Sequence, residues 1–283
     1  MRFLVSVDIE GASGIVSEEQ TRVGAIDYER GRRLLTDDCN AVIAGVIDVD
    51  PAATFVCHDT HGLDYRNLLL PDLHPAAEVV SGQPIIFYEL ADLQAESDPR
   101  YDAALLVGMH ARSGEPGILS HVLDDSRLKG VWINGEPVGE SHVTIGLAAH
   151  FGIPTALITG DQVVCGEIAR WLAGQIETAV VKESYTRYAA RCLPMPVARR
   201  KLREAGARAA ERVRSGLAKP RGYDLPATLE IELDSTQTAR YAAMIPTAGW
   251  DGGRRVRFES ANFVDCYHAL LTVFWVAESK LTP

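Results

Sequence analysis

Short apolar runs alternate along the first half of the chain with longer stretches in which apolar residues recur at helical spacing. Residues 3–7, 54–57 and 103–107 are runs of the first kind, and each predicts a buried strand. Residues 28–48 carry Leu35, Val42 and other apolar residues on one helical face and charged residues on the other, which predicts an amphipathic helix. Strand and helix therefore alternate, as in a sheet that helices cover.

This alternation continues to about residue 182 and predicts the fold class. We expect an α/β fold in three layers, with a mainly parallel sheet and helices on both of its faces. The further elements expected here are strands over residues 78–80, 130–135, 154–159 and 178–182, and helices over residues 87–93, 137–151 and 163–172.

The character of the sequence changes near residue 192. Residues 197–213 form an arginine-rich helical pattern, which is typical of a solvated helix face, and a loop with glycine and proline follows. Strands are then expected over residues 228–233 and 255–259, and helices over residues 236–244 and 263–277. We therefore predict a larger α/β domain over residues 1–190, with the candidate catalytic and metal-binding residues, and a smaller C-terminal α+β domain over residues 191–283.

Composition and charge exclude several classes of protein. The chain has 283 residues with 28 basic and 38 acidic side chains, and a net charge of −10 disfavours a general nucleic-acid binder. The N-terminal apolar run is too short for a signal peptide, and no run approaches the ~20 residues that span a membrane. Five scattered cysteines without a C-x-x-C pair favour reduced thiols. We expect a cytoplasmic protein that binds no membrane.

Two carboxylates follow the first predicted strand and form the first candidate site. Asp8 and Glu10 are two positions apart, so in extended chain both point to the same side. Two anions held this close repel each other unless a cation lies between them. We therefore expect a metal ion at this strand end, with Asp8 as the bridge between ions if there are two and Glu10 as a terminal ligand.

Further ligand types follow two other predicted strands. His58 and His61 come after the second strand, His110 comes after the third, and Glu140 lies in the first turn of a predicted helix. Ligands gather at the carboxyl ends of strands in an open α/β sheet, so we expect these side chains to meet. Histidine with carboxylate suits zinc, or else manganese, cobalt or nickel, better than calcium or magnesium. Two ions ~3.5–4 Å apart could share one hydroxide there.

Six segments resemble a known family in their order and spacing. They are SVDIEG at residues 6–11, DTHG at 59–62, LHP at 73–75, GMHAR at 108–112, PGILSH at 116–121 and NGEPVGE at 134–140. They resemble the D-aminopeptidases of peptidase family M55, and the similarity extends to the closing helix. It implies a dinuclear zinc site, a short peptide with an N-terminal D-residue as substrate, and a homo-oligomer in the form of a homodecamer ring. The implied ligands are Asp8, Glu10, His61, His110 and Glu140.

The resemblance also implies different roles for the individual histidines. It aligns His61 with the ligand, leaves His58 as a neighbour, and implies that His121 is the catalytic residue. His121 could act as a nucleophile or as a general acid and base, and we favour acid–base catalysis because a metal hydroxide would already supply the nucleophile. We expect the remaining histidines to be structural: His74, His142, His150 and His268.

One departure and two rival functions stay open. Relatives often have Gly-Asp-Asp where this chain has Gly160, Asp161 and Gln162, which bears on substrate preference but not on the implied ligands. One rival is a dinuclear hydrolase of another amide or of a phosphoester, although Arg112 is the only basic residue close to a ligand in sequence. The other is a non-catalytic peptide-binding protein associated with dipeptide transport, which would need no metal.

Overall fold

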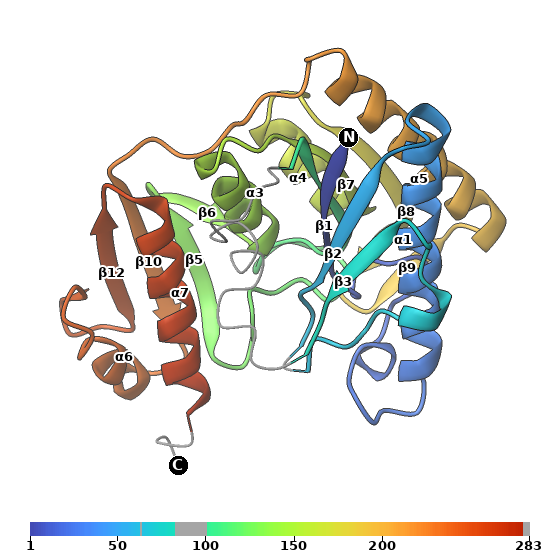
Figure 1. Cartoon of the computed structure of the whole chain (residues 1–283). Coiled ribbons are helices and arrows are strands. Elements are labelled where there is room, and N and C mark those ends of the chain that lie inside the picture. Colours follow the sequence, from blue (N-terminus) through green and yellow to red (C-terminus); the bar gives the residue numbers. More distant parts are fainter. Residues whose placement is uncertain (63, 83–100, 280–283) are drawn as a thin grey trace.

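The chain folds around two β-sheets that lie side by side (Figure 1). The computed structural model describes residues 1–62, 64–82 and 101–279. The helix predicted over residues 87–93 lies outside them. Within the described residues, no helix is both long enough and apolar enough to cross a membrane.

Sheet A has seven strands, and all neighbours are parallel except the last pair, β8 and β9. Its central strands β1 and β4 are buried on both faces, since Phe3 and Val5 join one apolar cluster and Leu4 joins another. The strands, in spatial order, are β3 (Ala77–Val80), β2 (Thr54–Asp59), β1 (Arg2–Val7), β4 (Ala103–Met109), β7 (Thr155–Asp161), β8 (Glu177–Thr186) and β9 (Ala189–Cys192).

Helices cover both faces of sheet A, which confirms the predicted three layers. On one face α1 (Tyr28–Val49) packs against α5 (Met195–Arg214). The two helices approach closely because Gly206 faces the main-chain oxygen of Val42, where a Cβ would lie 2.3 Å away. On the other face, α3 (Glu140–His150) and α4 (Gln162–Trp171) share an apolar cluster with the sheet.

Sheet B is antiparallel throughout and has one buried face. Along β10 (Ala227–Leu233) every second residue is buried, and α7 (Phe263–Glu278) packs on the buried side. The other elements are β11 (Gly249–Trp250), β12 (Arg255–Ser260), β5 (Leu128–Ile133), β6 (Glu136–Val138) and α6 (Thr236–Ala242).

Asn134 and Gly135 form a tight turn at the end of β5, and the chain then continues into a strand rather than directly into the predicted helix. Both residues have positive φ, 53° and 81°, as a two-residue hairpin turn requires. Residues 136–138 form β6 beside β5, so the helix predicted from residue 137 begins at Glu140 instead. The hairpin therefore places Glu140 at the start of a helix.

Contacts cross the predicted domain boundary at residue 190. Sheet B combines β5 and β6 from the first part of the chain with β10 and β12 from the second. Conversely, α5 belongs to the C-terminal part but packs on α1 and on β8 of sheet A. The division into residues 1–190 and 191–283 stays a prediction from sequence.

Candidate active site

The carboxyl ends of three neighbouring strands bring the predicted ligands to one edge of sheet A. Val7 at the end of β1 pairs with Asp59 of β2 and with Val107 of β4. Asp8 follows β1 directly, His110 follows β4 directly, and His61 follows β2 after one residue. The parallel register alone therefore places side chains that are far apart in sequence next to each other.

Two glycines let the ends of β1 and β4 come closer than side chains would allow. The amide of Gly11 donates to the carbonyl of Gly108 at 2.7 Å. A Cβ at Gly11 would lie 1.9 Å from the main-chain oxygen of Met109, and Gly108 has a φ of +74°. The Asp8 and Glu10 side chains are thereby held over the segment that carries His110.

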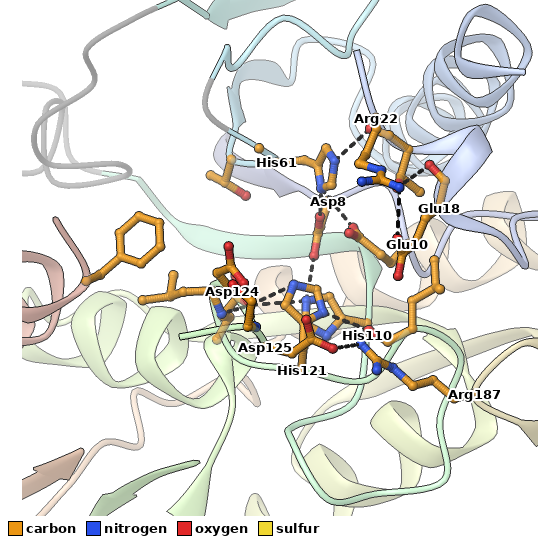
Figure 2. Close-up of a pocket in the computed structure, with 18 of the residues that line it drawn as sticks. Asp8, Glu10, Glu18, Arg22, His61, His110, His121, Asp124, Asp125 and Arg187 are labelled. Atoms are coloured by element: carbon orange, nitrogen blue, oxygen red, sulfur yellow. Dashed lines mark hydrogen bonds and ion pairs between the residues drawn. The ribbon is translucent and has the colours of Figure 1, made fainter. Parts of the chain in front are cut away.

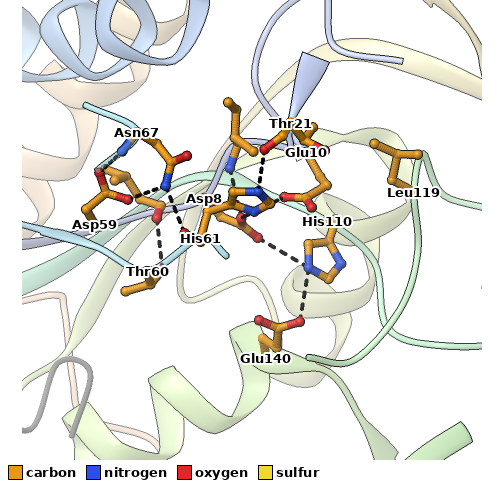
Figure 3. Close-up of polar contacts among 12 residues, drawn as sticks. Asp8, Glu10, Thr21, Asp59, Thr60, His61, Asn67, His110, Leu119 and Glu140 are labelled. Atoms are coloured by element: carbon orange, nitrogen blue, oxygen red, sulfur yellow. Dashed lines mark hydrogen bonds and ion pairs between the residues drawn. The ribbon is translucent and has the colours of Figure 1, made fainter. Parts of the chain in front are cut away.

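Asp8 lies at the centre of the cluster and is shared between two groups of side chains (Figure 3). Its Oδ1 is 3.1 Å from His61 Nδ1, which is also 2.9 Å from Glu10 Oε2. Its Oδ2 is 3.2 Å from His110 Nε2, which is also 3.2 Å from Glu140 Oε1. The structure thus brings together all five side chains predicted as metal ligands.

The second ring nitrogen of each site histidine contacts a main-chain carbonyl. His61 Nε2 is 2.9 Å from the oxygen of Thr21, and His110 Nδ1 is 3.0 Å from that of Ala111. A carbonyl only accepts hydrogen bonds, so each of these nitrogens carries a hydrogen. The nitrogen that faces the carboxylates is then free to offer its lone pair to a cation, the usual arrangement of metal-binding histidines. The donor set and its orientation therefore fit a divalent metal.

The charges in the cluster depend strongly on each other. Burial opposes ionisation of Asp8, but the hydrogen bond from His61 and the charge of His110 outweigh it and lower the pKa of the carboxyl group. Burial also opposes protonation of His110, yet Glu140 and Asp8 raise its pKa to about 10. Without metal, protonated histidines thus balance the carboxylates. A bound metal cation would take over that role and release the protons.

His121 lies beside the cluster and comes from the loop between β4 and β5 (Figure 2). Its ring stacks on that of His110, with centroids 4.1 Å apart and planes 7° from parallel. Its Nδ1 donates to the carbonyl of Leu119 at 2.7 Å, while Nε2 lies 3.8 Å from Glu140 Oε1. Leu119 is itself anchored, because its amide donates to the carbonyl of Arg187 at 2.9 Å. His121 Nε2 is therefore held toward the pocket.

A pocket of about 460 Å³ opens over these residues, and all six predicted site residues line it. Sequence reasoning missed the other walls, because their residues come from loops and from α7 and form no motif with the ligands. Arg187 from the β8–β9 turn pairs with Asp125, and Arg22 pairs with Glu18 at 3.2 Å. The missed lining residues with charged or aromatic side chains are Glu18, Arg22, Asp124, Asp125, Arg187, Phe274 and Glu278.

Asp59 is a further residue whose role the sequence did not reveal. Its carboxylate accepts hydrogen bonds from the amides of Asn67, at 2.5 Å, and Leu68, at 2.8 Å. The side-chain nitrogen of Asn67 bonds both to Asp59 and to the carbonyl of His61. This network holds the loop that carries His61 (Figure 3).

The other histidines lie apart from the pocket lining in the described part of the chain. His58 is buried within β2. His142 is buried against Trp171, and burial together with the nearby charge of Arg112 lowers its pKa to about 3. Arg112, the basic residue singled out near a ligand, pairs with Glu167 at 2.9 Å and does not line the pocket.

Three comparisons with known proteins agree with each other. The family model described as Peptidase_M55, D-aminopeptidase, matches residues 1–272. The D-aminopeptidase of Bacillus subtilis (strain 168) is 31% identical over 277 residues, which cover 96% of each chain. The solved structure of the Zn-dependent D-aminopeptidase DppA from Bacillus subtilis, a self-compartmentalizing protease, superposes with a TM-score of 0.90 at 28% identity and covers 100% of both chains.

Proposed function

This chain belongs to the M55 family of D-aminopeptidases and is a metallo-aminopeptidase, and from that premise we propose that it uses two zinc ions to remove N-terminal D-residues from short peptides. Zinc is the proposed metal because a Zn-dependent relative shares the fold and because mixed histidine and carboxylate ligands suit that ion. The proposed ligands are Asp8, Glu10, His61, His110 and Glu140.

The observation that carries the two-ion proposal is the position of Asp8. Its two oxygens face two different histidines, and each histidine has a further carboxylate of its own. Single ligand atoms of Asp8, Glu10 and His110 also lie within 4.8 Å of one another, and so do those of His110, His121 and Glu140. In this proposal Asp8 would be shared between the two ions and Glu10 would hold one of them, which is the division expected from the sequence.

When bound, zinc would lower the pKa of a water toward ~7, which provides hydroxide at neutral pH, and would polarise the scissile carbonyl. The chain itself would supply proton transfer. His121 Nδ1 donates to Leu119, so its Nε2 is the atom available to accept a proton and return it to the leaving amine. Stacking on His110 fixes the plane of the ring during that transfer. His121 thus acts as a general acid and base rather than as a nucleophile.

Metal analysis combined with paired substrates tests this function. We expect about two equivalents of zinc per chain, turnover of D-alanyl anilide well above that of the L-form, and loss of activity with a chelator. The same panel should contain a phosphoester and a non-peptide amide, which represent the rival hydrolase. Glu10→Gln should lose both metal and activity. Equal turnover of the D- and L-alanyl substrates would contradict the proposed preference for D-residues. Less than one equivalent of metal per chain, together with activity that resists a chelator, would contradict the metal-dependent mechanism.

We also propose that the chain assembles into a homo-oligomer, with a homodecamer ring as the specific form. Support comes from the relative that is described as self-compartmentalizing and shares the whole fold. Light scattering coupled to size exclusion would give the mass directly. A mass of one 30.8 kDa chain at working concentration would contradict the proposal.

A further inference from the structure

Lys182 is a buried cation directly beneath the segment that carries Glu10. It lies within β8, and only 1% of its surface is exposed. Its Nζ donates to three main-chain carbonyls: those of Glu10 at 2.6 Å, Ala12 at 2.8 Å and Ile15 at 2.8 Å. An ammonium has three hydrogens, so these bonds use its full capacity.

Burying this ammonium group costs folding free energy, which indicates that it has a specific role. A buried ammonium loses its hydration, and it is normally compensated by a carboxylate. In the part of the chain that the structure describes, the hydrogen-bond partners of Lys182 Nζ are main-chain carbonyls rather than carboxylates. Burial lowers the pKa of Lys182 to about 8, although the charges of Asp161, Asp38 and Glu10 oppose that shift. The carbonyls of a single loop, residues 10–15, take the place of water instead. That loop is therefore folded around the cation.

The amides of the same loop donate to hydrogen-bond acceptors elsewhere in the fold. The amide of Ser13 donates to the buried carboxylate of Asp38 at 2.7 Å, and the amide of Gly11 donates to Gly108. Lys182 thus binds the carbonyls of the loop while Asp38 and Gly108 bind its amides. At the start of the loop, the Glu10 side chain reaches His61 Nδ1 at 2.9 Å.

We propose that Lys182 is a positioning residue for the metal centre: by binding the carbonyl of Glu10 and the next turn of main chain, it fixes the direction of the Glu10 carboxylate. This inference rests on the metal site of the proposed function and goes beyond it, because Lys182 neither lines the pocket nor contacts a metal-binding atom. Loss of the three bonds would leave Glu10 free to move away from His61.

Zinc affinity of the variant Lys182→Met tests the proposal. Methionine keeps the unbranched apolar stem but donates no hydrogen bond. We expect zinc binding, measured by competition with a chelating dye, to weaken about 10–100-fold, the usual effect of removing an outer partner of a metal ligand. Hydrogen exchange at residues 11–15 should also accelerate in the zinc-free variant. Activity should recover at saturating zinc, because excess zinc compensates for a weakened site.

Lys201→Met is the matched control. Its Nζ donates to the carbonyl of Val180 on the same strand at 3.2 Å, but it does not contact the loop. We expect its zinc affinity to equal that of the wild type. Lys182→Gln, which keeps two neutral donors, should fall between the wild type and Lys182→Met.

Two results would overturn the proposal. One is a folded Lys182→Met with a zinc affinity within about threefold of the wild type, well short of the expected 10–100-fold loss. The other is failure of both Lys182 variants to fold without zinc, which would make Lys182 a general requirement of the fold. Zinc binding is measured without substrate. A wild type that binds zinc but cleaves no D-peptide would therefore refute the proposed function and leave the Lys182 test intact.

Discussion

The two sheets differ in whether the charged side chains next to their strands are buried or exposed to water. In sheet A, β1 is buried from Phe3 onward, and the residues that follow it, Asp8 and Glu10, are buried carboxylates. In sheet B, β10 alternates between buried and half-buried positions, and its outer residue Glu232 pairs with Arg255 at 3.1 Å in contact with water. Ionisable side chains therefore lie inside the protein at the edge of one sheet and on the surface of the other.

This difference explains where chemistry is possible. Water screens the charges on the outer face of sheet B, so their mutual interaction is weak. The charges at the edge of sheet A interact through a medium of lower polarity and shift each other's pKa, as His110 shows with a value near 10. Sheet B still contributes to the site, because β6 leads into Glu140 and α7 supplies Phe274 to the pocket.

The largest expected effect comes from Asp8→Asn. An asparagine offers one acceptor oxygen and a donor nitrogen, so it cannot serve both His61 and His110 as the carboxylate does. Activity should fall by more than the ~100-fold typical of outer partners, and bound zinc should decrease. Turnover and metal content measure this. A variant that keeps two equivalents of zinc would show that Asp8 does not bridge the ions.

His121→Ala should have the next largest effect, and it should separate proton transfer from metal binding. We expect a loss of about 10²–10⁴-fold in turnover, the usual contribution of a general acid and base. Zinc content should stay at the wild-type level, because the five proposed ligands remain. Activity close to that of the wild type would exclude His121 from the mechanism.

His142, which is buried in a helix next to sheet A, should make the free energy of unfolding depend on pH. Burial lowers its pKa from 6.5 to about 3, so the unfolded chain binds a proton that the folded chain excludes. This contribution to stability is fully present above pH 6.5 and is lost as pH falls toward 3, by up to ~1.4 kcal/mol per pH unit.

Denaturant titration of zinc-free protein measures this contribution. The variant His142→Gln should flatten the pH dependence, whereas His150→Gln, at an exposed position on the same helix, should leave it as in the wild type. Parallel profiles for His142→Gln and the wild type would assign the acid sensitivity to other groups.

Glu232→Gln on sheet B should have the smallest effect. Glu232 pairs with both Arg254 and Arg255, whose side chains are about half exposed, at 48% and 51%. We expect unfolding free energy to change by at most ~1 kcal/mol, and by less at high salt. Activity and zinc content should match those of the wild type. A loss comparable to that of the sheet A variants would contradict the comparison between the two sheets.

Local pattern predicted the strands of sheet A except β9 and placed candidate metal-binding residues at the ends of three of them. The strands that end before Asp8, near His61 and before His110 are short apolar runs, and their parallel order places those residues together without further information. The choice of His61 over His58 and the role of His121 came from the family resemblance. His61 and His121 line the pocket, whereas His58 is buried within β2.

Long-range contacts decided the strand pairing of sheet B, the walls of the pocket and the surroundings of Lys182, because no local pattern encodes such contacts. The pairing of β5 with β10 joins residues about a hundred positions apart, and the arginine and acidic walls of the pocket come from unrelated loops. Lys182 is the clearest case: in sequence it is one charged residue near the end of an apolar strand, which commonly points to solvent. Only the folded chain places three carbonyls of the loop at residues 10–15 around it, because those carbonyls are 167 to 172 positions away in sequence.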